Sequence, residues 1–215
     1  MGDEATTRVK PTTTPRRTQE QRRTETRFKL VEAAAALINE RGQAGLTLAA
    51  VGARAGYSRG IASYHFGTQT GLIEALLVQV EVEFEDGAEA IDHSGPPITV
   101  LTETCRVFHA MLANRSDLHR AFLALWAGAV VTDNEHRSVM QGADRHIRSR
   151  IAAAVSRGIG DGTIDNTIDP AGYAVVMLGQ LRGIELQHLM SPDEIDLDTT
   201  LKWVEASVVR DLARP

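Results

Sequence analysis

The sequence predicts an all-α protein, with an N-terminal three-helix domain that contains a helix-turn-helix motif and a larger helical domain after it. Three observations lead to this prediction. Apolar residues recur at helical spacing in most segments, and no segment alternates apolar and polar residues over the length of a strand. Residues that commonly cap helices precede several of these segments. Two short helical patterns with a glycine between them lie near the N-terminus.

The composition is that of a protein with a real hydrophobic core. The chain has 215 residues, of which 43% are hydrophobic and 24% charged, and this length fits one or two compact domains. No stretch approaches the roughly 20 apolar residues that a membrane-spanning helix needs, and the first thirty residues lack the apolar segment of a secretory signal. Cys105 is the one cysteine, which excludes an intrachain disulfide. We therefore expect a cytoplasmic protein that does not enter a membrane.

Charge is distributed unevenly along the chain. The formal net charge is −5, yet residues 1–66 hold 11 Lys or Arg against 6 Asp or Glu, whereas residues 67–215 hold 12 against 22. A basic N-terminal part on an acidic body predicts a head that binds a polyanion. A basic disordered tail attached to an average domain is the alternative interpretation.

The N-terminal residues differ from the rest in composition. Residues 1–23 contain six Thr, two Pro and no Leu, Ile or aromatic residue. Such a segment cannot bury enough apolar area to offset the entropy of ordering it, so we expect a flexible basic arm. From Thr24 the pattern changes to a helix that stops at Gly42. Its apolar face consists of Leu30, Val31, Ala34, Leu37 and Ile38.

Three more helices are expected next. Thr47 is placed to cap a short helix that ends at Gly56, and Ser58 to cap a helix that runs to about Phe66. Thr68 is placed to cap a fourth helix.

Beyond the stretch DHSGPP at residues 92–97, the pattern is helical to the C-terminus. Asp169 followed by Pro170 indicates a helix that begins with an N-cap and a proline in its first position. The helical patterns cover about 98–114, 117–131, 135–158, 170–190 and 198–213.

The second helix of the motif presents a polar face. If Ala62 and Phe66 face the core, a turn of 100° per residue directs Gly60 and Tyr64 away from it. This face suits a helix in the major groove of DNA, where Arg59 can bond a guanine edge with two hydrogen bonds. An ordinary solvated helix face is the alternative. The expected DNA-binding residues are Thr47, Ser58, Arg59, Gly60, Ile61, Ser63, Tyr64, His65, Gln69, Arg22 and Arg23.

Residues 24–80 resemble the N-terminal domain of the TetR family of bacterial transcriptional regulators. The resemblance is carried by ERG at the end of the first helix, by LTLAAVGARAGYSRG, and by YHF followed by GLIEALL. It implies a homodimer that reads a palindrome, with a C-terminal domain for ligand binding and dimerisation. The positions that match the family's DNA-facing residues are Thr47, Arg59, Gly60, Tyr64 and His65.

Two residues depart from the family's pattern. Ser63 stands where an aromatic residue is common, and Gln69 stands where a lysine commonly contacts phosphate. Loss of that lysine removes one ionic contact per subunit. Basic residues of the arm would compensate by entering the adjacent minor groove. They are Arg16, Arg17, Arg22 and Arg23.

Two motifs point to other chemistry and are better explained by structure. Gly56 to Gly60 matches the G-x-S-x-G motif of hydrolases, but a helical pattern precedes it where a strand would be needed, so Ser58 is better explained as an N-cap. Glu185 and His188 form one Glu-x-x-His pair, half of a di-iron set, with no second copy. We expect no enzymatic activity, no cofactor and no metal.

The last two helical patterns carry more apolar surface than one small domain needs to bury. A four-helix bundle across a two-fold axis, with two helices from each subunit, would cover it, and in the TetR family the last two helices usually do this. Packing inside a monomer is the alternative. The expected dimerisation residues are Gly179, Gly183, Leu186, Leu201, Val204, Val208 and Leu212.

The middle helices contain aromatic residues and methionines that suggest an effector cavity, although a packed core would use the same residues. Cys105, Arg106 and His109 are candidate polar anchors. Nothing in the sequence specifies the ligand. The expected effector-binding residues are Phe108, Met111, Phe122, Trp126 and Met140.

The sequence thus predicts a flexible arm at 1–23, a DNA-binding domain at 24–68, and an effector-binding and dimerisation domain at 69–215. We expect a repressor that binds double-stranded DNA as a homodimer and is released by a small molecule, with the fourth helix as the connecting lever. The alternatives are a helical interaction module that has lost DNA binding and a serine hydrolase that uses Ser58.

Overall fold

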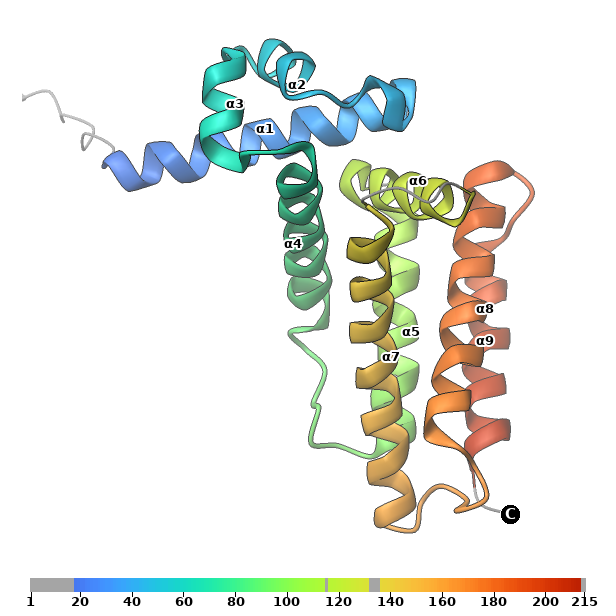
Figure 1. The fold of residues 1–215 in the computed structure, drawn as a ribbon. Coiled ribbons are helices and arrows are strands. Elements are labelled where there is room, and N and C mark those ends of the chain that lie inside the picture. Colours follow the sequence, from blue (N-terminus) through green and yellow to red (C-terminus); the bar gives the residue numbers. More distant parts are fainter. Residues whose placement is uncertain (1–17, 115, 132–135, 214–215) are drawn as a thin grey trace, which may run out of the picture.

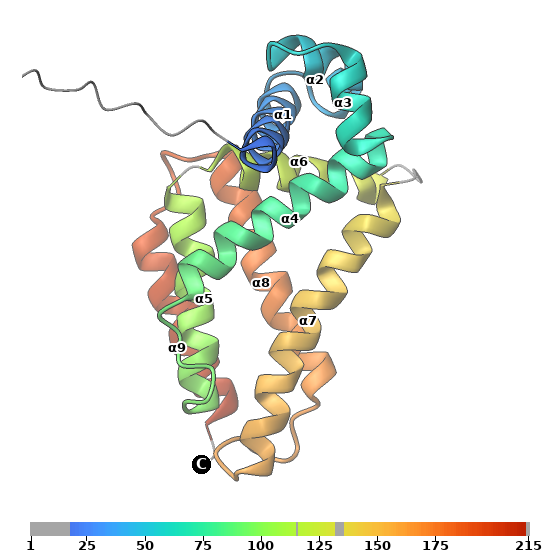
Figure 2. The ribbon, with the colours of Figure 1, turned by 90° about the vertical axis from the view of Figure 1, so that its left-hand side faces the viewer.

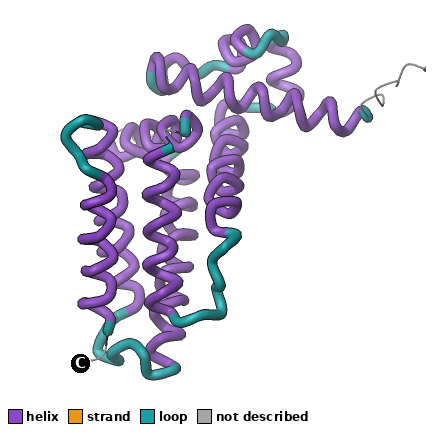
Figure 3. Tube along the Cα trace, turned by 180° about the vertical axis from the view of Figure 1, so that it is seen from behind, coloured by secondary structure: helices purple, strands orange, loops and turns teal. Residues whose placement is uncertain are grey.

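The computed structural model describes residues 18–114, 116–131 and 136–213, and this part of the chain folds into helices joined by short loops (Figures 1 and 3). Within it there is no strand, and the one β-type pairing is an isolated bridge between Ile164 and Ala213. The α-helices are α1 (Gln19–Arg41), α2 (Leu48–Arg54), α3 (Arg59–Phe66), α4 (Gln69–Ala88), α5 (Pro97–Ala113), α6 (Asp117–Val131), α7 (Arg137–Gly160), α8 (Pro170–Met190) and α9 (Leu197–Leu212), with a 3-10 turn η1 (Gln43–Gly45). The all-α prediction is confirmed.

The first helix begins earlier than the sequence pattern indicated. Thr18 caps α1 by accepting a hydrogen bond from the backbone of Gln21, and the Gln21 side chain accepts one from the backbone of Thr18. This reciprocal pair satisfies two backbone donors that the start of a helix leaves free. Arg22 and Arg23 therefore stand in the first two turns of a helix rather than in the expected arm. Residues 1–17, with Arg16 and Arg17, lie outside the described residues.

Helices α2 and α3 form the expected helix-turn-helix. Thr47 and Ser58 cap them, each accepting from the backbone nitrogen three residues ahead. Gly56, in the turn, has φ = 77°, a left-handed conformation that glycine adopts without strain. Gly52 lets α2 approach the start of α3, because a Cβ there would lie 2.8 Å from the carbonyl oxygen of Ser58.

The body is a bundle of long helices with the head on top. In Figure 1, α1 lies across the upper end of the molecule with α2 and α3 above it, and α6 lies between α1 and the bundle. Helix α4 leaves the head and crosses α5 and α7, as Figure 2 shows from the side. Asp169 caps α8 and Pro170 occupies its first turn, as the sequence predicted.

Two hydrophobic clusters form the core. The first contains Leu30, Ala62 and Phe66 of the head together with Leu76 of α4 and Phe122 of α6, so it runs from the head into the body across the expected boundary at residue 68. The second cluster joins α5, α7, α8 and α9. The head is therefore not packed as an independent unit.

The apolar seam of α9 faces this second cluster, which corrects part of the expected dimer surface. Val208 and Leu212 are 0% exposed and Val204 is also buried. Leu201 is partly buried against the same cluster. The spacing therefore reflects packing within one chain, and the buried Val204, Val208 and Leu212 are not available to a partner subunit.

Leu212→Ala is expected to lower the free energy of unfolding by about 2–5 kcal/mol, because it leaves a cavity among fully buried side chains. Chemical denaturation followed by circular dichroism measures this change. Lys202→Ala, at an exposed position of the same helix, is the control and should change stability by less than about 0.5 kcal/mol. Equally small effects of both substitutions would contradict the burial of Leu212 within the chain.

Candidate DNA-binding face and effector cavity

Helix α3 buries one side and exposes the other. Ala62 is 0% exposed and Phe66 is buried in the first cluster, whereas Tyr64 on the opposite side is 70% exposed. Arg59, Gly60 and Ile61 are exposed as well. The packing thus fixes which side of this short helix meets the surroundings, and that side carries an arginine, a phenol and a glycine that lets another molecule approach the backbone.

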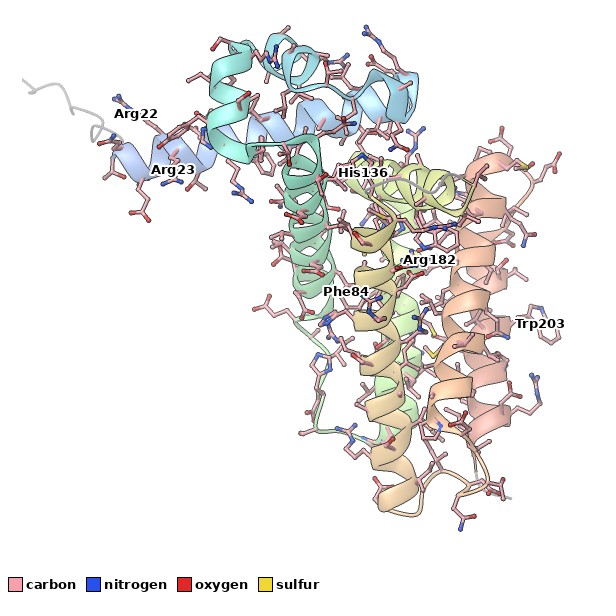
Figure 4. The ribbon with its side chains drawn as sticks, viewed as in Figure 1. Arg22, Arg23, Phe84, His136, Arg182 and Trp203 are labelled. Carbon is pink, nitrogen blue, oxygen red and sulfur yellow. The ribbon has the colours of Figure 1, made fainter. Side chains whose placement is uncertain are left out.

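Basic residues from α1 extend the same face. The guanidinium of Arg23 lies 5.9 Å from the ring centre of Tyr64, and that of Arg27 lies 5.6 Å from the ring centre of Phe66. These cation–π contacts join the start of α1 to α3. Arg22 is also exposed, and Figure 4 shows Arg22 and Arg23 projecting from the α1 end that lies beside α3.

The electrostatics of this face affect His65. Its imidazole is half-buried next to Tyr64, with ring centres 5.4 Å apart. Burial lowers the pKa of His65 below 6.5, and the charges of Arg23 and Arg27 lower it further. This environment favours the neutral form of the ring over the charged form.

The remaining predicted residues lie at the start of their helices or beside them. Thr47 and Ser58 are exposed caps. Ser63 and Gln69 are half-buried. Gln69 is neutral where the family pattern has a lysine, so the surface there is less basic than that pattern implies. Arg54, by contrast, pairs with Glu40 through two hydrogen bonds of 2.7 and 2.6 Å, which leaves its charge balanced.

A cavity of about 470 Å³ lies between α4, α5, α6, α7 and α8. Its walls are largely apolar and include Val80, Phe84, Phe108, Met111 and Phe122. The rings of Phe84 and Phe108 lie 5.1 Å apart. A cavity of this size and lining is typical of sites that hold a drug-sized molecule.

Three of the five expected effector residues line this cavity, namely Phe108, Met111 and Phe122. Met140 is instead buried in the first hydrophobic cluster. Trp126 packs against that cluster, and its Nε1 donates to Asp144 Oδ2 at 2.9 Å. Both therefore support the wall and do not line the cavity.

The expected polar anchors also lie elsewhere. Cys105 and His109 line a much smaller hollow against α8 and α9, and burial raises the pKa of the Cys105 thiol to about 12. Arg106 is exposed and forms ion pairs with Glu103 and Glu205. None of the three is among the residues that line the cavity.

A buried polar cluster stands at the cavity wall, and of its residues the sequence analysis named only Glu185, as part of a Glu-x-x-His pair. Arg182 Nη1 donates to Glu185 Oε2 at 2.9 Å, and His119 Nε2 donates to Glu185 Oε1 at 3.0 Å. Arg182 and His119 both line the cavity. Burial alone would raise the pKa of Glu185, but the hydrogen bond from His119 and the charge of Arg182 outweigh it and hold the pKa below its ordinary value. An arginine and a glutamate three residues apart, in a helix that is otherwise apolar, were the available signal.

The outer side of α8 and α9 is apolar and exposed. Trp203 is 71% exposed and projects away from the bundle in Figure 4, and Val175, Val176 and Val209 are exposed on the same two helices. At Gly179 and Gly183 an added Cβ would meet nothing within 4 Å. Leu186 is half-buried. This surface is distinct from the seam that packs inside the chain.

Two family models match the chain. The model described as bacterial regulatory proteins of the tetR family matches residues 30–76. The model described as the C-terminal part of BetI-type transcriptional repressors matches residues 97–213. Together they cover the helix-turn-helix head and the helical body.

One curated relative and two solved structures resemble this chain over most of its length. The chain is 28% identical over 199 residues to the HTH-type transcriptional regulator TtgR of Pseudomonas putida, covering 90% of this chain and 94% of the relative. The SmeT–triclosan complex superposes with a TM-score of 0.73 at 21% identity, covering 88% and 92% of the two chains. A TetR transcriptional regulator of Chloroflexus aurantiacus superposes with a TM-score of 0.74 at 20% identity, covering 91% and 100%. At these identities the two structures support the fold alone.

Within the described ranges 18–114, 116–131 and 136–213, none of the helices combines the length and the apolar character that a membrane span requires. No group of three or more His, Cys, Asp and Glu side chains there is placed to hold a metal ion.

The pKa of His65, followed by NMR titration, is expected to lie below 6.5. Because the unfolded chain then binds a proton more readily than the folded one, this group destabilises the fold as the pH falls from about 6.5 through the lowered value. Arg23→Gln should raise the pKa by removing a nearby positive charge, whereas Arg120→Gln in the body should leave it unchanged. A pKa of 6.5 or above in the unsubstituted protein would contradict the described environment.

Proposed function

This chain belongs to the TetR family of bacterial transcriptional regulators, whose members are not enzymes, and from that premise we propose that it is a cytoplasmic repressor. It would bind a palindromic operator as a homodimer and would leave the operator when a small molecule fills the cavity. The observation that carries the proposal is the outward face of α3, which keeps Arg59, Gly60 and Tyr64 exposed while Ala62 and Phe66 are buried.

Recognition would place α3 in the major groove. Arg59 would bond a guanine edge and Ile61 would contact a thymine methyl group, which are the pairings that side chains of these shapes favour. Tyr64, His65 and Thr47, with the exposed Arg22 and Arg23, would bond the phosphates on either side. A neutral imidazole keeps one N–H, which His65 could donate to a phosphate.

A homodimer would form through the outer side of α8 and α9. Val176, Gly179 and Gly183 on α8 and Trp203 and Val209 on α9 form its apolar surface, with the glycines allowing close approach of two helices. Burying this surface against a second copy would remove an exposed apolar patch from water. A two-fold axis there would present two α3 helices, about 34 Å apart, to successive major grooves.

The effector would act through α6 as well as α4. Helix α6 supplies Phe122 and His119 to the cavity and packs along α1 of the head on its other side. Asn39 Nδ2 of α1 donates to the carbonyl oxygen of Asp117 at 2.9 Å, which ties the two helices at the start of α6. A ligand that displaces α6 would therefore change the separation of the two heads, and DNA would weaken ligand binding by the same factor.

Arg59→Ala is expected to cost about 1–3 kcal/mol in operator affinity and to relax the base preference at one position of each half-site. The operator is first selected from random duplex DNA, and affinities are then measured by gel shift on the operator and a mismatched duplex. Arg106→Ala, on the body, is the control. If Arg59→Ala binds both duplexes as the parent does, Arg59 does not read DNA; if the parent selects no sequence, the proposed DNA binding fails.

Trp203→Arg is expected to convert a dimer into a monomer, because it places a charge in the centre of the proposed apolar interface. Sedimentation equilibrium measures the mass, and operator binding should weaken together with it. Lys29→Ala, exposed on α1 far from this surface, is the matched control. An unchanged dimer would remove the α8–α9 surface from the proposal.

A further inference from the structure

One wall of the cavity is charged although it is buried. Arg182 lines the cavity and is 4% exposed. Its Nη1 is engaged by Glu185, as described above. Its Nε and Nη2, however, have no hydrogen-bond partner among the described residues. Figure 4 shows Arg182 in the interior of the body, at the end of the bundle next to α6.

These two nitrogens form one edge of the guanidinium. Nε and Nη2 can donate two parallel hydrogen bonds to one carboxylate or to a similar anionic group. Asp144 forms a loose ion pair with this edge: its Oδ1 lies 3.6 Å from Nη2 and has no hydrogen-bond partner, while its Oδ2 accepts from Trp126. Nη2 is thus near a carboxylate without a hydrogen bond to it, and Nε has no partner at all. A buried cation with unused donors carries a desolvation penalty that an acceptor on a ligand would relieve.

The aromatic residues around Arg182 argue against a cationic ligand at this wall. The guanidinium carbon lies 4.6 Å from the ring centre of Phe122 and 5.8 Å from that of Trp126. These faces, which would otherwise attract a quaternary ammonium group, already hold a positive charge. A second cation would have to compete with Arg182 for these two rings.

The other arginines of the cavity are committed and closer to solvent. Arg150 pairs with Glu85, and Arg157 donates to the backbone oxygens of His93 and Gly95. Both are much less buried than Arg182. Within the described part of the chain, the buried cavity-lining cation with unused donors is therefore Arg182.

We propose that the effector is an amphipathic anion, whose apolar body fills the cavity beside Phe84 and Phe108 and whose carboxylate or comparable acidic group accepts two hydrogen bonds from Nε and Nη2 of Arg182. This inference rests on the proposed role of the cavity as the effector site. It adds the chemical class of the ligand and the residue that selects it.

Two fluorescent probes of nearly the same shape test the inference. Anilinonaphthalene sulfonate carries an anionic group, and N-phenylnaphthylamine has the same rings without it. The full-length protein is titrated with each probe. The ratio of the two dissociation constants gives the contribution of the anionic group to binding affinity. In the unsubstituted protein the sulfonate should bind about tenfold more tightly or better, as expected for hydrogen bonds to a charged group.

Two variants separate the role of Arg182 from folding. Arg182→Lys keeps the positive charge beside Glu185 but lacks the two-pronged edge, so the preference for the sulfonate should fall about threefold or more. The double variant Arg182→Met and Glu185→Gln removes the ion pair as a whole and should bind both probes within about threefold of each other. Arg106→Gln, an exposed arginine outside the cavity, should keep the parent's preference. Circular dichroism verifies that each variant remains helical.

The results of these titrations distinguish a wrong ligand class from a wrong effector site. Equal binding of both probes by the parent, an unchanged preference in the double variant, or displacement of the sulfonate by tetraethylammonium would overturn the anionic class and leave the cavity as an effector site. Binding of neither probe would overturn both the inference and the proposed effector role. The DNA-binding proposal is tested independently by the gel shift.

Discussion

The rest of the structure depends on one continuous hydrophobic cluster that joins the head to the body. It holds Ala62 and Phe66 of α3, which sets the outward face of that helix, and it also holds Phe122 of α6 and Met111 of α5, which line the cavity. Protein interiors are packed as densely as organic crystals and deform little. Packed side chains therefore connect the cavity wall to the head, and no flexible linker separates the two.

The same packing explains why a charged cluster inside the body is informative. A buried ion pair contributes little net stability, because desolvation offsets most of the attraction between its charges. Glu185 accepts hydrogen bonds from Arg182 and His119, whereas the Nε and Nη2 of Arg182 have no hydrogen-bond partner and Nη2 meets Asp144 only in a 3.6 Å ion pair. Stability alone does not favour this arrangement. Its position on the wall of an apolar cavity fits the proposed role of Arg182 in selecting an anionic ligand.

Local patterns were enough to predict most of the helices and the orientation of α3. The caps at Thr47, Ser58 and Asp169 form hydrogen bonds at short range, so residue type and spacing reveal them directly. The start of α1 at Gln19 was missed because the capping pair of Thr18 and Gln21 outweighs the polar composition of the turn that follows. Apolar spacing in α9 identified a buried side, but spacing carries no information on which molecule covers it.

The sequence by itself determined the helical class, the helix-turn-helix and the resemblance to a regulator family, because each follows from contacts between residues a few positions apart. Only the tertiary structure decided which apolar faces meet inside one chain, since that depends on helices far apart in sequence. It brought His119 of α6 to Glu185 and Arg182 of α8, directed Val208 inward and left Trp203 outside. The polar wall of the cavity exists only where side chains of α6 meet side chains of α8, so spacing within either helix could not reveal it.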